Sequence, residues 1–356
     1  MKSTKIFLSL VGAVTMTFGF STSSVQGQCH ADVNHDQQVD AIDLTLVLSA
    51  WGTDGSTTGS DINNDAFVDG VDLSILFSGW GQCTGPTWAT VLEWAPDAAV
   101  VTNATLRNEI TASGLPWRVR DISSNIQMLL IPAGTFTMGC NPMDKQCGVD
   151  ESPLHQVTLS AFYMGRYEVT QAQWTARMGS NPSGYSGASD SPSRPVELVS
   201  WNMITSGSTS FMGLTGLRLP TEAEWERAYR AGTTTVFHSY LGQPNGFNTH
   251  NFLVNIAWYD VNSGNETHAV GGKFANALGL YDMSGNVWEW CQDWYGSTYY
   301  ASSPLTNPAG PATGSTRVLR GGSWFFASEL CRGSERNVGV PSGAGSNVGF
   351  RVARTP

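Results

Sequence analysis

In two stretches of the chain, oxygen-bearing side chains have the spacing that a calcium-binding loop requires. One begins at Asp32 and the other at Asp61, and each carries such side chains at loop positions 1, 3, 5, 9 and 12. Position 7 of such a loop binds through its backbone carbonyl, here Gln38 and Phe67. The predicted side-chain ligands are Asp32, Asn34, Asp36, Asp40 and Asp43, then Asp61, Asn63, Asp65, Asp69 and Asp72. Carboxylates crowded in this way repel one another without a cation, and six or seven oxygens suit Ca²⁺.

The residues after each loop also repeat. Apolar positions in "LTLVLSAWG" recur in "LSILFSGWG", as expected for one helix after each loop. Position 6 is Gln37 or Ala66, where the standard loop has glycine, and position 12 is Asp in place of Glu. The duplicated pattern over residues 28–83 resembles a type I dockerin, which implies a small all-α, EF-hand-like module that docks onto cohesin modules of scaffold proteins. A calcium-stiffened spacer is the alternative.

A second stretch whose residue types could carry out chemistry lies near the C-terminus. "RVLRGGSWFFASELCR", residues 317–332, combines a Gly-Gly turn, a tryptophan and one cysteine. It is preceded in order by "IPAGTFTMG", "YEVTQAQW", "RLPTEAEWERAYRAG" and "GLYDMSGNVWEW", and followed by "NVGFRVAR". Together these motifs resemble the formylglycine-generating enzyme (sulfatase-modifying factor) family over residues 117–356. The resemblance implies a C-type-lectin-like fold that is stabilised by calcium and buried aromatics.

The same resemblance implies a calcium site in "YDMSGNVWE". Asp282 and Glu289 would bind through their side chains, and Gly285 and Val287 through their backbone carbonyls. This is an oxygen set that suits Ca²⁺. Ser323 and Trp288 match residues that line the family's pocket.

Family members that make formylglycine use two cysteines, which together suit Cu(I) and let it activate oxygen to oxidise a substrate cysteine. The second of these cysteines matches Cys331, but the first matches Phe326, which has no donor atom. Cys331 is therefore the one candidate catalytic residue, and copper is implied only if the enzyme interpretation holds.

All six cysteines are predicted to form disulfides, because two nearby cysteines of an exported protein are usually bonded. Cys29 and Cys83 bracket the calcium repeat and are expected to close it. Cys140 and Cys147 are expected to form a local bond. Cys291 is then predicted to pair with Cys331, which would leave no thiol for catalysis.

The N-terminal residues are typical of a signal peptide. Lys2 and Lys5 precede an apolar stretch that ends at Phe20 and is too short to span a membrane, and cleavage is predicted after Gly27. The mature chain is thus expected to be secreted or extracellular, with no membrane span. A net charge of −10 without a basic cluster argues against nucleic-acid binding.

Helices and strands must position the motifs described above. Thr170 with Gln173, and Thr221 with Glu224, are spaced as capping boxes and predict two helices. Short strands and Gly-rich loops surround them, which indicates an α+β domain over 117–356. Residues 84–116 are predicted to be a linker that contains one amphipathic helix near 98–110.

Three functional hypotheses follow. The first is a non-catalytic module that binds an extracellular protein or glycan and is attached through the dockerin. The second is a copper-dependent oxidase that generates formylglycine in a sulfatase-type substrate. The third is a component of an extracellular polysaccharide-degrading assembly, although no glycosidase carboxylate pair is recognisable.

Overall fold

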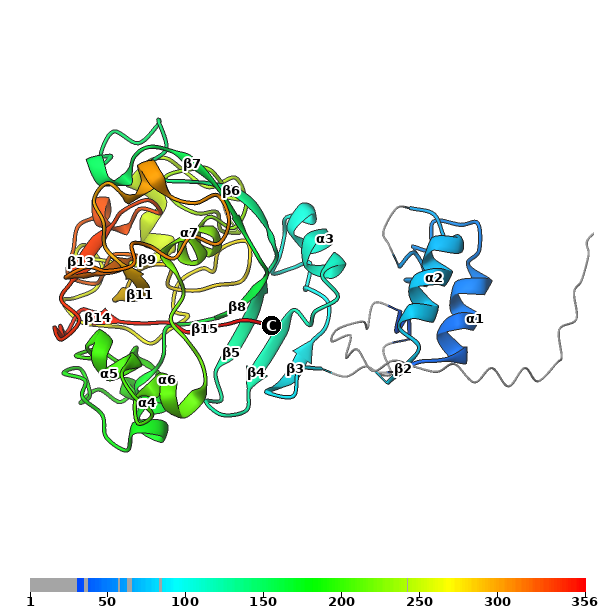
Figure 1. Cartoon of the computed structure of the whole chain (residues 1–356), viewed down its shortest axis with the longest axis horizontal. Helices are drawn as coiled ribbons and strands as arrows, with labels where there is room; N and C mark the ends of the chain where they lie inside the picture. The colour runs from blue at the N-terminus through cyan, green and yellow to red at the C-terminus, as the bar shows by residue number, and fades with distance from the viewer. Residues whose placement is uncertain (1–30, 35–37, 57, 63–65, 83–84, 242) are drawn as a thin grey trace, which may run out of the picture.

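The computed structural model describes residues 31–34, 38–56, 58–62, 66–82, 85–241 and 243–356. A small two-helix module precedes a larger body of sheets, short helices and loops (Figure 1). The predicted signal peptide, the ligands Asp36, Asn63 and Asp65, and the cysteines Cys29 and Cys83 lie outside the described residues.

The small module consists of two helices and one short strand pair. Helix α1 is Ala41–Ser49 and α2 is Gly70–Ser78, while β1 (Gln38–Val39) pairs antiparallel with β2 (Gly81–Gln82). Asp40 and Asp69 cap the helices through capping boxes with Asp43 and Asp72. A single apolar core joins the two halves: Ala31, Val33, Val39, Val47, Ala50, Ile62, Val68 and Leu76.

A five-stranded antiparallel sheet forms one side of the large body. Its order is β15-β8-β5-β4-β3. The bounds are β3 Ala89–Glu93, β4 Arg118–Asp121, β5 Gln127–Ile131, β8 Phe162–Gly165 and β15 Ala353–Arg354. The C-terminal strand β15 thus forms one edge of a sheet whose other strands come from the first part of the domain.

The prediction that residues 84–116 form a linker is wrong. Strand β3 is the edge of the five-stranded sheet, and α3 (Ala104–Ala112) buries Leu106 and Ile110 in the main core. The helix was expected, but it begins at Ala104, where the Asn103 side chain accepts the first free backbone amides. This segment therefore belongs to the large domain.

A second sheet carries the C-terminal motifs. Its order is β13-β12-β11-β14, with β11 Trp288–Trp294, β12 Arg317–Arg320, β13 Asn337–Gly339 and β14 Val348–Gly349. Two strand pairs complete the β structure: β6 (Gly134–Met138) with β7 (His155–Leu159), and β9 (Ala257–Trp258) with β10 (Ser284–Gly285).

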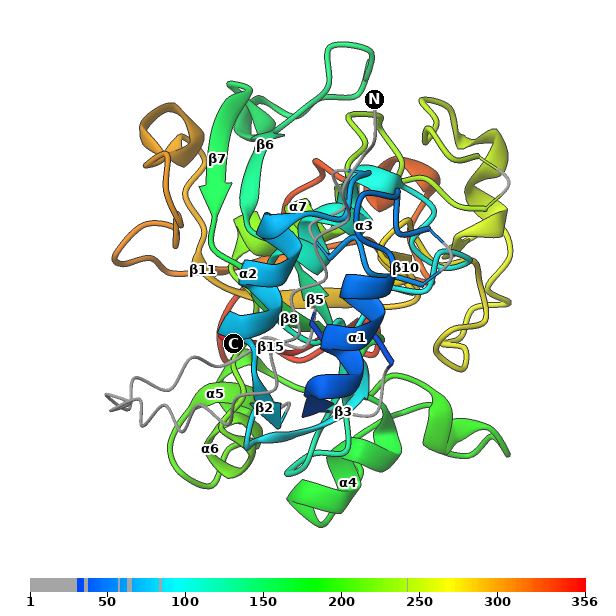
Figure 2. The same cartoon turned by 90° about the vertical axis from the view of Figure 1, so that its right-hand side faces the viewer.

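Short helices lie beside the sheets, and α4, α5 and α6 group together in both views (Figures 1 and 2). They are α4 Gln171–Met178, α5 Trp201–Thr205, α6 Phe211–Thr215 and α7 Glu222–Arg230, with 3₁₀ turns η1 Val149–Glu151, η2 Ser191–Ser193, η3 His250–Asn255, η4 Tyr299–Ser302 and η5 Ser328–Cys331. Both predicted capping boxes are present, at Thr170 and Thr221. Among the described residues, no helix has the length and apolarity to cross a membrane.

Candidate functional site

The stretch that carries Cys331 folds as a tight turn between β12 and η5. Gly321 and Gly322 have φ values of +95° and +78°, a region that side-chain-bearing residues rarely adopt. A Cβ on Gly322 would lie 2.7 Å from Cys331 Sγ, so the turn can pass over the cysteine only because residue 322 has no side chain. The Gly-Gly pair therefore allows the backbone to pack over Cys331 in the interior of the domain.

Phe326 occupies space beside Trp288. Its ring lies 6.0 Å from the indole, centroid to centroid, with 68° between the planes, and it packs against the main core. The neighbouring Phe325 is 58% exposed. The position matched to the family's first cysteine is therefore an apolar packing residue.

Cys291 and Cys331 are both free, so the predicted bond between them is wrong. Cys291 lies on β11 in the main core, whereas Cys331 packs into a separate cluster with residues such as Tyr259 and Phe237. Burial raises the pKa of both thiols well above that of an exposed cysteine. Neither is a ready thiolate nucleophile.

Ser323 and Trp288, the predicted pocket residues, are almost completely buried, at 0% and 1% exposure. Both side chains are therefore covered from solvent, and the ring of Phe326 lies against the indole of Trp288. The indole Nε1 of Trp288 makes no hydrogen bond with any described residue. What remains accessible here is the outer aromatic surface at Phe325.

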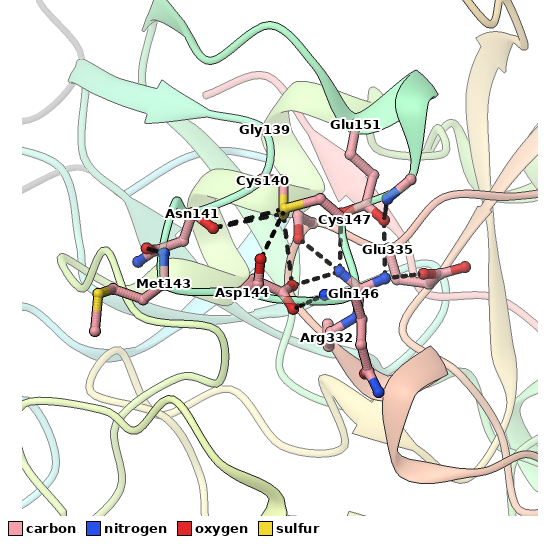
Figure 3. The surroundings of a disulfide bond; sticks show 12 residues. Gly139, Cys140, Asn141, Met143, Asp144, Gln146, Cys147, Glu151, Arg332 and Glu335 are labelled. Carbon is pink, nitrogen blue, oxygen red and sulfur yellow. Dashed lines mark hydrogen bonds and ion pairs between the residues drawn. A yellow bond between two sulfur atoms is a disulfide. The ribbon is translucent and has the colours of Figure 1, made fainter.

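Cys140 and Cys147 form the predicted disulfide, with Cα atoms 5.7 Å apart. The loop that they close is tied to the segment after Cys331 (Figure 3). Arg332 Nη1 lies 2.5 Å from Asp144 Oδ2, and Arg332 Nη2 lies 2.8 Å from Glu151 Oε1. In the described part of the chain, Cys140, Asp144 and Cys147 are also the group of three close enough to share a metal ion, but the two sulfurs are bonded to each other.

Three carboxylates are buried near the predicted calcium site of the large domain. Glu289 is held by Arg351, whose Nε and Nη2 each lie 2.6 Å from a carboxylate oxygen, and by Trp225 Nε1 at 2.7 Å. Glu168 accepts from the Asn286 side chain and the Val287 amide. Burial, followed by the charges of Asp282 and Glu289, raises the pKa of Glu168.

Asp282 is the member of this group with unused binding capacity. Its Oδ2 accepts from the Gly271 amide at 2.7 Å, but its buried Oδ1 has no partner among the described residues. Burial raises the pKa of Asp282 to about 6. Arg351 makes its direct ion pair with Glu289, so a divalent cation at Asp282 would offset negative charge that remains in this group.

Oxygen donors of this kind are those that calcium prefers, but one of them is almost fully used. A carboxylate offers about four lone-pair sites, and Glu289 already uses three of them on Arg351 and Trp225. Sequence reasoning missed Glu168 and Arg351 as parts of this group. Both stand in motifs that point to the family, "YEVTQAQW" and "NVGFRVAR", but nothing in those strings shows that they meet.

In the small module, the described predicted ligands lie around the starts of the two helices. Asp43 Oδ1 accepts from the Val33 amide at 2.7 Å, and Asp72 Oδ1 accepts from the Ile62 amide at the same distance. Asp61 Oδ2 accepts from the Ala66 amide at 2.8 Å. Ala66, at loop position 6, has φ +69°, the conformation for which the standard loop uses glycine.

Two family models match the chain. The model described as sulfatase-modifying factor enzyme 1-like domain matches residues 116–356, and the dockerin type I domain model matches residues 30–78. The α+β fold and the dockerin module expected from the sequence are confirmed.

Named relatives fall into more than one class. A formylglycine-generating enzyme of Streptomyces coelicolor is 32% identical over 63% of this chain and 87% of that protein. A protein named chaperone protein LppX, from Paenibacillus barcinonensis, is 32% identical over 56% of this chain and 82% of its own length. Among solved structures, the Treponema denticola variable protein 1 is 33% identical with a TM-score of 0.57, covering 65% of this chain and 95% of that one.

Proposed function

Because this chain belongs to the sulfatase-modifying factor enzyme 1-like family, we propose that it is a non-catalytic member of that family. In this proposal it is an exported, calcium-stabilised module that binds an extracellular protein or glycan. Its dockerin type I domain attaches it to a cohesin-type scaffold.

Phe326 is the observation that carries the proposal. Oxidation of a substrate cysteine through Cu(I) needs two soft donors, and Phe326 supplies none where the family's first cysteine stands. Its ring instead packs against Trp288. Cys331 is completely buried, and burial raises the pKa of its thiol, so the remaining donor is not presented as a thiolate.

The binding surface is proposed to be the aromatic ridge that contains Phe326. Tyr185, Trp324, Phe325 and Phe326 contact one another in sequence, with ring centroids 5.3–5.5 Å apart. Phe325 is the exposed ring of this ridge. Amphipathic and aromatic side chains of this kind are frequent in recognition surfaces.

Calcium is proposed at both predicted places. In the large domain, Asp282 Oδ1 and one free lone-pair site of Glu289 would contribute, together with the carbonyls of Gly285 and Val287. In the dockerin, the two acidic loops would hold one ion each. The ions would stabilise the folded chain, because they bind it and not the unfolded chain.

The decisive experiment is an oxidation assay with purified protein, Cu(I), oxygen and a cysteine peptide, read by mass spectrometry of the peptide. We expect no aldehyde product above the copper-only control. Aldehyde that forms at a rate dependent on protein concentration would refute the proposal. Retention on immobilised cohesin modules, with calcium and with a chelator, tests the attachment separately.

The free state of Cys331 favours a second candidate, a divergent copper-dependent oxidase that generates formylglycine. One donor of the family's pair is still present as a thiol, and local opening of the turn at Gly322 would expose it. Conversion of the cysteine peptide that is abolished by Cys331→Ser but kept by Cys291→Ser would support this candidate. The third interpretation, recruitment into a polysaccharide-degrading assembly, depends on which cohesin the dockerin binds.

A further inference from the structure

A cavity lies away from the Cys331 segment and is lined by residues of α3, the β6–β7 hairpin and the C-terminal end of α7. Its volume is about 430 Å³, within the usual size range of small-molecule sites. Ile131, Phe136 and Leu278 provide apolar lining, and threonine side chains provide hydroxyls around it. The cavity thus offers both kinds of surface that a small polar organic molecule needs.

Arg227 of α7 is a poorly neutralised cation in the wall of this cavity. Its side chain is only 11% exposed. Nε and Nη2 both donate to the carbonyl of Pro132, at 3.1 and 2.8 Å, and Nη1 donates to no described residue. Gly134 makes this placement possible, because a Cβ there would lie 2.6 Å from Nη2.

The contrast with Arg230, one turn later, shows what Arg227 lacks. Arg230 places two nitrogens 2.6 and 2.8 Å from Glu226 Oε1. The nearest carboxylate oxygen to Arg227 is Glu109 Oε2, 4.0 Å from Nη2, on a side chain that is 42% exposed. A buried guanidinium is most stable with a carboxylate in direct, hydrogen-bonded contact, and the described part of the chain provides none.

Hydroxyl groups line the same cavity as Arg227. Thr105, Thr137, Thr233 and Thr234 all line the cavity. The hydroxyls of Thr105 and Thr234 make no hydrogen bond with other described residues, so they are free to bind a ligand. The N-terminal end of α3, capped by Asn103, lies at the same cavity and adds positive potential.

We propose that this cavity binds a small carboxylate-bearing sugar, with its carboxylate on Arg227 and its hydroxyls on the threonines. The carboxylate supplies the direct partner that Glu109 does not provide. The sugar ring has hydroxyl edges for the threonines and C–H faces for Phe136 and Leu278. This site is separate from the aromatic ridge, and it does not depend on whether the chain oxidises cysteine.

Isothermal titration of the full-length protein with D-glucuronate tests the proposal, with D-glucose as the matched neutral sugar. We expect glucuronate to bind at least tenfold more tightly than glucose, since a charge-assisted hydrogen bond is usually worth that much or more. Arg227→Gln should lose this preference. Arg218→Gln, at a different cavity, should keep it.

Glu109→Gln gives a second test that leaves Arg227 and its contact with Pro132 intact. Removal of the competing carboxylate should strengthen glucuronate binding several-fold. This result remains informative if thermal unfolding shows that Arg227→Gln does not fold. Equal binding of glucose and glucuronate, no glucuronate binding by the unmodified protein, or no effect of Glu109→Gln would overturn the proposal.

Discussion

The ring of Phe326 meets the indole of Trp288 edge to face, with the centroids 6.0 Å apart. Such pairs contribute about 0.5–1.5 kcal/mol beyond their buried area. Five positions later, Cys331 is buried in a different apolar cluster. The aromatic contact therefore stabilises this region at the position where the family resemblance implies a metal-binding cysteine, and the proposal can be tested by placing a thiol there.

Phe326→Cys should create a pair of thiols that binds Cu(I). Two thiolates suit this ion, so we expect about one equivalent to bind more tightly than to the unmodified protein. The measurement is an anaerobic titration of Cu(I) against a chromophoric competitor. The matched control is Phe325→Cys, which places a thiol on the exposed neighbour. A folded Phe326→Cys variant with unchanged copper affinity would show that Cys331 is too deeply buried to take part.

Local signals in the sequence predicted the local structure well. The capping boxes at Thr170 and Thr221 depend on residues three positions apart, and both form as expected. The two acidic loops were likewise recognisable from the sequence, since the same ligand spacing occurs in both and each repeat supports the assignment of the other as a calcium-binding loop. Phe326 was recognisable as a departure because the Gly-Gly turn before it fixes the alignment.

Relationships between distant segments could not be predicted in the same way. Arg351 meets Glu289 across 62 positions, and strand β3 joins a sheet that ends with β15. The Cys291–Cys331 bond was predicted from how common disulfides are in exported proteins, which says nothing about where the two thiols lie. In the structure, β11 and η5 place them in separate clusters. Such contacts depend on the packing of the whole domain and leave no periodic pattern in the sequence.

The two free thiols should react only when the protein unfolds. Cys291 and Cys331 are both 0% exposed, so alkylation in the native state requires local opening. We expect labelling at least about a hundredfold slower than in denaturant. Mass spectrometry of non-reduced digests should also recover Cys140 bonded to Cys147. A peptide in which Cys291 is bonded to Cys331 would contradict the structure.

Ala66→Gly should stabilise the second dockerin loop. Ala66 has φ +69°, which is strained for alanine and free of strain for glycine. We expect a gain of about 0.5–1 kcal/mol, measured as slower hydrogen–deuterium exchange in peptides from residues 61–82 at saturating calcium. The matched control, Ala41→Gly in the first turn of α1, should destabilise its helix. Faster exchange in Ala66→Gly would mean that the added chain entropy outweighs the strain.

Asp293 should make stability depend on pH. It is 3% exposed and accepts from the Glu222 amide at 2.9 Å. Burial, followed by the charge of Glu222, raises its pKa to about 8, against 3.8 for an ordinary aspartate. Between these values the folded chain holds a proton that the unfolded chain releases, so the free energy of unfolding should fall as pH rises from 4 to 8.

Asp293→Asn should remove this part of the pH dependence. The amide keeps the size of the side chain and a carbonyl oxygen for the Glu222 amide, but it carries no charge to bury. Above pH 8 we therefore expect the variant to be more stable than the unmodified protein, by on the order of 1–3 kcal/mol, with little difference near pH 4. Urea unfolding at several pH values measures this, with the exposed Asp97→Asn as control. If Asp293→Asn were less stable at high pH, the ionised carboxylate would have to be held there by a favourable interaction, such as with Arg336, that outweighs its burial.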